Sequence, residues 1–228
     1  MENFFKRIEQ KYIINKKEYD DIQEIISKYF LMDSYYESKI YNIYFDNDNR
    51  DIIINSLEKP VYKKKIRVRS YGIPNDDSLV FFEIKEKYKG IVYKRRVKLS
   101  LLEYNNYINK GIMPNHDKQI MREIDYNIKY YKLHPYMVLT YDRLSYYSKE
   151  DINFRITFDS NLRSRYNDLE FRDNNDRLYF KDKKYIMEVK CSNSLPIWFV
   201  SYLSKNKIYP ISFSKIGSIY KESRDVKC

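Results

Sequence analysis

Apolar and polar residues alternate along much of the chain in the way that half-buried strands require. Residues 6–14 show this alternation, whereas residues 16–30 gather their apolar side chains on one helical face. Runs rich in β-branched and aromatic residues predict further strands at 39–46, 61–71, 79–87, 91–99, 135–147, 153–159 and 184–191. The pattern therefore predicts about seven or eight mostly antiparallel strands with helices among them, and it leaves the strand order open.

Helix start and stop signals separate the strands. Ser100 and Glu103 have the spacing of a capping box and Gly111 provides a stop, so residues 101–110 should be helical. Other helical patterns lie between Pro114 and about Tyr131, at 196–203 and at 212–222, with a short helix or loop at 48–57 and a polar, irregular or partly paired stretch at 161–182. This inventory is typical of an α+β fold, and we expect residues 1–228 to form a single domain.

Each predicted strand is apolar on one side and ionic on the other. Arg67 and Arg69 alternate with Ile66 and Val68, so the two guanidinium groups share one face. The same division recurs in Glu9 and Lys11, Glu83 and Lys85, Lys94 and Arg96, Arg155 and Thr157, and Glu188 and Lys190, with Arg95 as the exception. On one strand this is the ordinary wet face of an antiparallel sheet, but its repetition with Lys and Arg indicates a cationic surface.

A cationic face of this kind suits a chain of phosphates. Lys and Arg make charge-assisted contacts with phosphate oxygens, and these contacts strengthen where water is excluded. If the sheet closed with this face inward, the face would line a lumen whose few carboxylates could hold a divalent metal. The periodicity alone leaves open whether the face lines a tunnel or covers an outer surface.

Composition supports an acidic partner and excludes two common phosphate-binding motifs. The 228 residues include 43 Lys and Arg against 32 Asp and Glu, a net charge of +11. Abundant Lys, Asn, Ile and Tyr, all with codons rich in A and T, explain part of this excess, so position carries more weight than the total. The 4 glycines are too widely spaced for a P-loop or a dinucleotide-binding glycine motif. Phosphate should therefore be bound by side chains.

Cysteine and histidine are too sparse for a zinc site. Cys191, Cys228, His116 and His134 lie far apart, so we expect no zinc spacing and no disulfide partner. Cys191 is predicted to be a small buried residue. The first residues lack the apolar stretch of a secretory signal, and no apolar run approaches the roughly 18 residues of a membrane span. We expect a soluble, cytoplasmic protein.

Short motifs in this chain resemble those of the triphosphate tunnel metalloenzymes, and more closely their polyphosphate polymerase branch, the VTC domain. The first, Arg7-x-Glu9-x-Lys11, resembles the opening strand of that superfamily. The others follow in the order of the VTC domain: Tyr44-Phe-Asp46, Lys65-Ile-Arg67-Val-Arg69, Phe82-Glu83-Ile-Lys85, Lys94-Arg95-Arg96, Tyr141-Asp-Arg143, Phe154-Arg155-Ile-Thr-Phe-Asp159, Met187-Glu188-Val-Lys190, Leu195-Pro196 and Phe213-Ser214-Lys215. Their order over nearly the whole chain makes the resemblance specific.

The resemblance implies a closed antiparallel barrel of about eight strands that forms a cationic tunnel with helices around it. It also implies a metal-dependent phosphotransferase. Such a polyphosphate polymerase transfers the γ-phosphoryl group of ATP to a growing inorganic polyphosphate chain and releases ADP. Carried over residue by residue, the catalytic cations are Lys11, Arg67, Arg69, Lys85, Lys94 and Arg155. The same residues would bind substrate together with Arg96, Arg143, Lys190 and Lys215.

The resemblance assigns a Mn²⁺ or Mg²⁺ ion to Glu188. Glu9 and Glu83 share ionic faces and would either ligate the metal or pair with arginines. One departure from the family pattern is Ser212, where a second lysine usually precedes the residue that matches Lys215.

Two alternative functions remain. A triphosphatase on the same fold would need more paired glutamates than lysines, and the acidic candidates here are few. A basic module that binds nucleic acid would not explain the ordered motifs, so we expect no nucleic-acid partner. Because related polymerases are often coupled to membrane proteins, the resemblance also implies a membrane-protein partner that would hold the chain at the inner face of a membrane.

Overall fold

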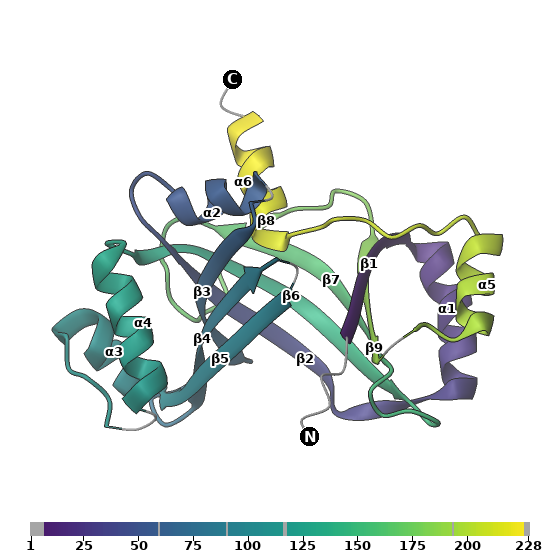
Figure 1. Ribbon diagram of the computed structural model, residues 1–228, viewed down its shortest axis with the longest axis horizontal. Helices are drawn as coiled ribbons and strands as arrows, with labels where there is room; N and C mark the ends of the chain where they lie inside the picture. Colours follow the sequence, from purple (N-terminus) through teal and green to yellow (C-terminus); the bar gives the residue numbers. More distant parts are fainter. Residues whose placement is uncertain (1–6, 59, 90, 116–117, 193, 226–228) are drawn as a thin grey trace. The chain divides into compact units, whose positions relative to one another are not determined.

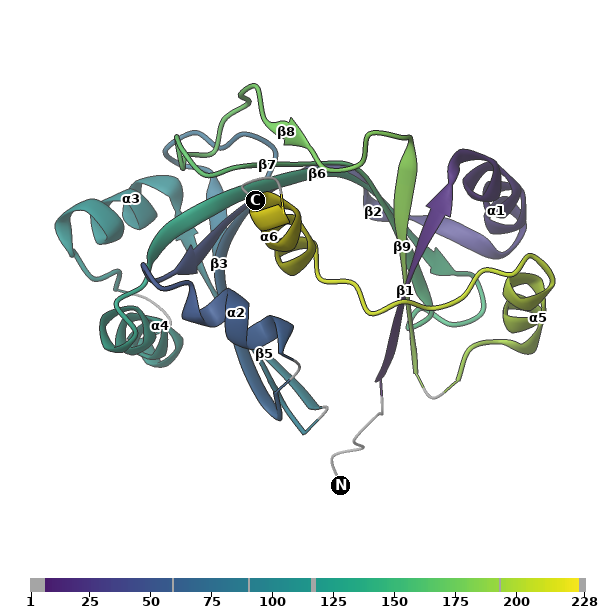
Figure 2. The same cartoon turned by 90° about the horizontal axis from the view of Figure 1, so that it is seen from above.

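The computed structural model describes residues 7–58, 60–89, 91–115, 118–192 and 194–225 (Figures 1 and 2). Contacts divide the chain into two compact units. Unit 1 comprises Met1–Lys39, Tyr141–Leu162 and Leu178–Phe213, and unit 2 comprises Ile40–Thr140, Arg163–Arg177 and Ser214–Cys228. The single domain therefore stays a prediction. Among the described residues, no helix combines the length and the apolar character that crossing a membrane requires.

The strands form one large antiparallel sheet in the order β1-β9-β7-β6-β2-β3-β4-β5, with β8 paired to β7. The strands are β1 (Arg7–Asn15), β2 (Phe30–Asp46), β3 (Tyr62–Tyr71), β4 (Leu79–Tyr88), β5 (Ile91–Ser100), β6 (His134–Ser148), β7 (Arg155–Arg165), β8 (Arg177–Leu178) and β9 (Lys184–Ser192). This arrangement confirms the α+β class.

The predicted closed barrel is wrong, because the sheet is open. Within the described residues, the strand order begins at β1 and ends at β5 without a pairing that joins them. The alternation along a strand reports which face is buried, but it carries no information about which edges exchange backbone hydrogen bonds.

In unit 1, α1 (Lys16–Tyr29) packs an apolar face against the strands. A capping box between Asn15 and Glu18 starts this helix, and Ile22 and Ile26 are its buried residues. They join Tyr12, Phe158, Met187 and other residues of the core. The helix α5 (Ile197–Lys205) lies beside α1 in both views, and Pro196 is its N-cap rather than its predicted first residue.

In unit 2, α3 (Leu101–Lys110) and α4 (Lys118–Tyr130) cover the apolar face of β3, β4 and β5. The capping box of Ser100 and Glu103 is present, and Gly111 ends α3 with a φ of 69°. Tyr104 and Ile124 belong to the same core as the strand residues. Two more helices, α2 (Asp51–Leu57) and α6 (Lys215–Asp225), contact each other.

Two strands are longer than the sequence pattern predicts. β2 begins at Phe30, whereas we expected a start at residue 39. Apolar and polar residues do not alternate between these positions, and even Leu31, Met32 and Tyr35 are exposed. β7 continues past Asp159 to Arg165, and its pairing with β8 confirms that the stretch 161–182 is partly paired. The predicted β4–β5 hairpin is present, although Gly90 lies outside the described residues.

Candidate functional site

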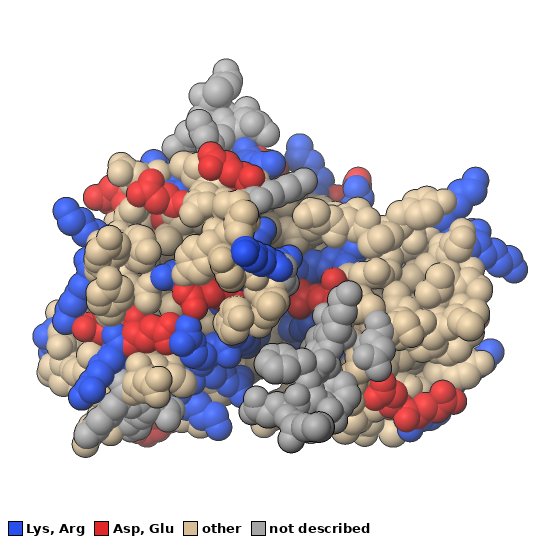
Figure 3. Space-filling model, viewed as in Figure 1, with Lys and Arg blue, Asp and Glu red and all other residues tan. Residues whose placement is uncertain are grey.

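Unit 2 carries a cationic face on three neighbouring strands. The β3–β5 cationic face, as we call it, comprises Lys65, Arg67, Arg69, Glu83, Lys85, Lys94 and Arg96. Strand register aligns six of these residues in two rows, Arg67–Glu83–Arg96 and Lys65–Lys85–Lys94, while Arg69 lies opposite Phe81. The alternate residues Ile66, Val68, Phe82 and Ile84 are fully buried. Figure 3 shows Lys and Arg gathered with some Asp and Glu over these strands.

Glu83 is the carboxylate at the centre of this face, and it is paired with cations. Its side chain is almost completely buried, its Oε2 accepts a hydrogen bond from Arg67 Nε at 2.8 Å, and its Oε1 lies 2.6 Å from Lys94 Nζ. Burial alone would raise the pKa of Glu83, but Arg67, Arg69 and Lys94 lower it to about 2. Both carboxylate oxygens of Glu83 therefore face cations of the protein. Of the two roles that we expected for Glu83, metal ligand or partner of arginine, the contacts match the second.

Two residues of β2 hold the arginines in place. Tyr44 Oη accepts a hydrogen bond from Arg67 Nη1 at 3.0 Å, and Asn42 Oδ1 accepts one from Arg69 Nε at 3.1 Å. Burial would raise the pKa of Tyr44, but the nearby charges of Arg67 and Lys65 lower it to about 8. Our sequence reasoning missed Asn42 and quoted Tyr44 only as part of a motif, without a role in the site. Their alternation with the buried Ile43 places both on the same face as the arginines.

The start of α6 adds to the same face. Lys65 Nζ donates a hydrogen bond to Ser214 Oγ at 2.8 Å, and the backbone N–H of Gly217 donates to the same oxygen at 3.2 Å. Lys215 is the first residue of this helix. Within the motif Phe213-Ser214-Lys215, Ser214 therefore contacts Lys65 of the β3–β5 cationic face, and Lys215 follows it at the start of α6.

Two cations next in sequence to this face point to its other side. Arg95 Nη2 lies 2.7 Å from Glu86 and 2.5 Å from Glu123 of α4. Lys64 donates a hydrogen bond to Asn127 of the same helix. These residues tie α4 to the sheet, which explains why Arg95 is the exception in the alternation.

Unit 1 carries a different ionic face. The β1–β9 ionic face, as we call it, comprises Glu9, Lys11, Glu188 and Lys190, which register pairs as Glu9–Lys190 and Lys11–Glu188. Lys11 Nζ lies 3.1 Å from Glu9 and 4.0 Å from Glu188, while Lys190 Nζ lies 2.7 Å from Glu188. Acidic and basic residues thus alternate here, and the Glu188 side chain is only 9% exposed.

Arg143 and Arg155 each face a carboxylate outside this group. Arg143 donates two hydrogen bonds to Asp159, at 2.6 and 2.8 Å. Burial would lower the pKa of Arg143, but Asp159 raises it well above its ordinary value. Arg155 Nη1 lies 3.6 Å from Asp33. The structure thus places both arginines in ion pairs within unit 1, and strand register sets Arg155 opposite Lys190 of the β1–β9 ionic face.

The β1–β9 ionic face offers two carboxylates to a divalent metal, whereas the β3–β5 cationic face offers one. No three His, Cys, Asp or Glu side chains cluster as a metal site within the described parts of the chain. Mg²⁺, however, is commonly held by one or two carboxylates together with substrate phosphates. Glu9 and Glu188 lie diagonally on one face, and the ammonium group of Lys11 is near both. Two carboxylates placed in this way suit a metal ion that is also bound by substrate phosphates.

Comparisons with known proteins agree with the motifs. The model of the VTC domain family matches residues 6–221. An alignment over 148 residues shows 24% identity to the vacuolar transporter chaperone complex subunit 4 of Schizosaccharomyces pombe. The alignment covers 55% of this chain and only 20% of the yeast protein.

Two solved structures share the fold. A candidate adenylate cyclase of Bacillus halodurans has a TM-score of 0.58 at 15% identity and covers 91% of this chain and 93% of its own. A candidate adenylyl cyclase of Hippeastrum, described as having a dominant triphosphatase activity, has a TM-score of 0.54 at 12% identity, with 95% and 96% covered. At these identities the likeness concerns the fold.

Proposed function

Because the chain belongs to the VTC domain family, we propose that it is a polyphosphate polymerase that transfers the γ-phosphoryl group of ATP to a growing inorganic polyphosphate chain and releases ADP. The observation that carries this proposal is the β3–β5 cationic face, where six Lys and Arg residues share one side of the strands with the single carboxylate of Glu83. Such an excess of positive charge suits a polyanion with several phosphates.

The cations of this face would supply most of the catalysis. Phosphoryl transfer passes through a loose transition state, so alignment and charge neutralisation matter more than acid–base chemistry. A terminal oxygen of the polyphosphate chain attacks the γ-phosphorus, and the bond to the β–γ bridging oxygen breaks, so the electron pair leaves with ADP. The attacking phosphate is already ionised and needs no general base.

Arginine and lysine have different parts in this scheme. Arg67 and Arg69 can hold phosphate oxygens with two parallel N–H groups, whereas Lys85 and Lys94 act as point charges. Glu83, Tyr44 and Asn42 orient the two arginines through the contacts given above. Because these partners fix the guanidinium planes before substrate binds, less ordering is required on binding. Arg96, Lys65 and Lys215 extend the positive surface along the polymer.

On the β1–β9 ionic face, Glu188 with Glu9 would hold Mn²⁺ or Mg²⁺, and Lys11 and Lys190 would bind phosphates. A bound divalent ion neutralises charge on phosphate oxygens. Arg143, fixed by two hydrogen bonds to Asp159, would act as a positioning residue or a phosphate ligand, and Arg155 as a phosphate ligand near Asp33.

The proposal extends to partners and location. The yeast relative is a subunit of a vacuolar transporter chaperone complex. We therefore propose that this chain is cytoplasmic and works with a membrane-protein partner that receives the polymer. Nucleic acid is not an expected ligand. If it were, binding would fall steeply with salt and no ADP would form.

One assay tests the proposal against its closest alternative. Purified protein with ATP and Mn²⁺ should form ADP together with a long, acid-labile phosphate polymer. A triphosphatase acting on ATP would release ADP and orthophosphate without polymer, and the alternating carboxylates of the β1–β9 ionic face are the feature that favours this alternative. In the polymerase, ADP should equal the phosphate recovered in polymer. ADP with an equal amount of orthophosphate and no polymer would replace the polymerase by a hydrolase.

A further inference from the structure

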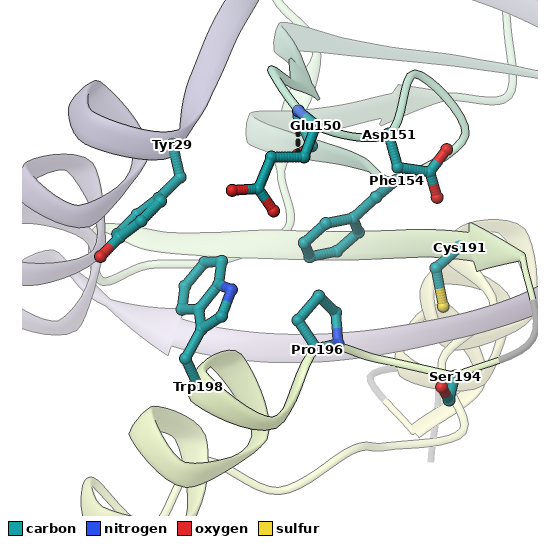
Figure 4. A pocket seen from close by; sticks show the side chains of 9 residues that line it. Tyr29, Glu150, Asp151, Phe154, Cys191, Ser194, Pro196 and Trp198 are labelled. Carbon is teal, nitrogen blue, oxygen red and sulfur yellow. Dashed lines mark hydrogen bonds between the residues drawn. The ribbon is translucent and has the colours of Figure 1, made fainter.

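Unit 1 contains a small cavity on the side of the strands opposite to its ionic residues. The cavity has a volume of about 60 Å³. It lies among the C-terminal end of α1, the turn between β6 and β7, the end of β9 and the start of α5 (Figure 4). Phe154 and Cys191, which line it, are buried and alternate with Arg155 and Lys190. The proposed phosphate-binding groups thus point to the other face.

Three aromatic rings form the walls of this cavity. Tyr29 and Trp198 are stacked with ring centroids 4.7 Å apart, and Phe154 approaches Trp198 with centroids 6.5 Å apart at 61°. Phe30 and Phe199 also pack against Phe154, with ring centroids 5.0 and 5.7 Å from its own. The rings are therefore held by neighbours before any ligand arrives.

A carboxylate stands at the mouth of the cavity. In Figure 4 the Glu150 side chain points toward the space between Tyr29, Phe154 and Trp198. No hydrogen bond or ion pair engages its carboxylate among the residues that the structure describes. Asp151 differs, because its Oδ1 accepts a hydrogen bond from the backbone N–H of Asn153.

The turn that carries Glu150 is fixed to the aromatic wall. The backbone N–H of Lys149 donates to the carbonyl of Tyr29 at 2.9 Å, and Lys149 Nζ donates to the carbonyl of Lys28 at 2.7 Å. The N–H of Glu150 donates to Ser148 Oγ at 3.2 Å. Phe154 closes the turn by donating its N–H to the carbonyl of Asp151. The backbone that carries Glu150 is therefore fixed next to Tyr29 and Phe154.

Aromatic walls with one carboxylate match a particular class of ligand. The faces of Trp, Tyr and Phe attract cations, and aromatic cages recognise alkylated ammonium groups, whose methyl groups also gain from leaving water. The volume equals roughly four to six water-sized groups, close to a trimethylammonium head. Burial, with a smaller contribution from Asp151, raises the pKa of the Cys191 thiol, so this lining residue favours binding over covalent chemistry. We propose that this cavity binds an alkylated ammonium group.

Trp198 makes the proposal directly measurable, because it is the chain's 1 tryptophan. The whole protein is titrated with choline while Trp198 emission is recorded, and then with 3,3-dimethylbutan-1-ol, a neutral compound of the same shape. We expect a saturable change with choline and roughly two- to thirtyfold weaker binding of the neutral compound. Equal responses to the two compounds, or no response to choline either free or as a lipid headgroup, would overturn the proposal.

Two variants test the carboxylate and the aromatic wall separately. Glu150→Gln removes the charge, and Tyr29→Leu removes one ring at a side chain that is 43% exposed and should tolerate the change. Each should weaken choline binding roughly two- to thirtyfold while the thermal midpoint stays near that of the parent. The matched control is Glu24→Gln on the exposed side of α1, which should bind choline as the parent does. Unchanged affinity in both cavity variants would contradict the assignment.

The same readout separates two sources of the ammonium group. A response to free choline identifies a soluble ligand. A response to phosphatidylcholine vesicles, with none to phosphatidylglycerol vesicles, identifies a lipid headgroup. A response to neither free choline nor choline headgroups would reject the site. ATP turnover does not enter this test, so its outcome is independent of the proposed polymerase activity.

Discussion

The two ionic faces use the same alternation of residues but differ in how charge is balanced. On the β3–β5 cationic face, the buried carboxylate of Glu83 is the only acidic group among several Lys and Arg residues, and its pKa is lowered to about 2. On the β1–β9 ionic face, two carboxylates alternate with two lysines, and Glu9 is 34% exposed at its side chain. A surplus of cations attracts polyanions, whereas accessible carboxylates attract metal ions. In the proposed polymerase, this difference would divide phosphate and metal binding between the two faces.

The largest expected effect comes from removing the best-fixed cation of the β3–β5 cationic face. Arg67→Ala should lower ATP turnover by about a thousandfold, because it removes a paired donor to phosphate and leaves Glu83 with one fewer partner. The assay measures ADP release and polymer together. Arg95→Ala is the matched control, since Arg95 has the same charge on the opposite face and its loss should leave turnover within about threefold. Equal losses in both variants would remove the distinction between the faces.

Loss of a carboxylate on the β1–β9 ionic face should have a different signature. Glu188→Gln should lower turnover by about a hundredfold at low metal concentration, and excess Mn²⁺ should restore part of it. The half-saturating metal concentration is the quantity to measure. Glu83→Gln should not shift it, because the two oxygens of Glu83 lie 2.8 and 2.6 Å from Arg67 and Lys94, whereas Glu188 Oε2 lies 4.0 Å from Lys11 Nζ. Unchanged turnover and metal dependence in Glu188→Gln would contradict the metal assignment.

Glu83 should matter for stability in a defined pH range. Its folded-state pKa is lowered from the ordinary 4.5 to about 2, so the ionised group stabilises the fold above pH 4.5, and this contribution is lost as the pH falls toward 2. Glu83→Gln should therefore cost about 2–3 kcal/mol of unfolding free energy at pH 7 and much less near pH 2.5. Chemical denaturation at both pH values measures this difference. A cost independent of pH would mean that packing, not charge, is lost.

The smallest effect should come from Tyr44. Its lowered pKa of about 8 predicts a tyrosinate absorbance component near pH 8 that disappears in Tyr44→Phe. Because the neutral phenol accepts a hydrogen bond from Arg67, the substitution should change turnover at pH 7 by less than about threefold. Tyr104→Phe is the control, since burial raises the pKa of Tyr104 and should leave no component in this range. Persistence of the component in Tyr44→Phe would locate it elsewhere.

Much of the fold could be predicted because its signals are local. The boundaries of α3 follow from a capping box and a glycine stop, both of which lie within one helix length. The ionic faces followed from a period of two, since a side chain on a strand takes its direction from its neighbours in sequence. The open sheet could not be predicted, because pairing between distant edges leaves no periodic trace.

The sequence predicted which residues of the candidate site share a face, but it did not predict which of their side chains contact one another. Arg67, Lys94 and Glu83 were expected on one face, but that Glu83 would be enclosed by cations depends on the register of β4 with its two neighbours. Asn42 was missed because its role depends on reaching across to Arg69 from another strand. Register and cross-strand contact are properties of the assembled sheet.

The position of β5 at the end of the strand order has a consequence for handling the protein. Ile91, Val92 and Tyr93 are exposed at 58%, 47% and 50%, and the three residues after them are Lys94, Arg95 and Arg96. Exposed edge strands with apolar residues tend to pair with other chains, and charged side chains oppose that pairing. The cations of β5 therefore also protect against self-association. Variants that neutralise them should be checked by size-exclusion chromatography before a loss of turnover is assigned to phosphate binding.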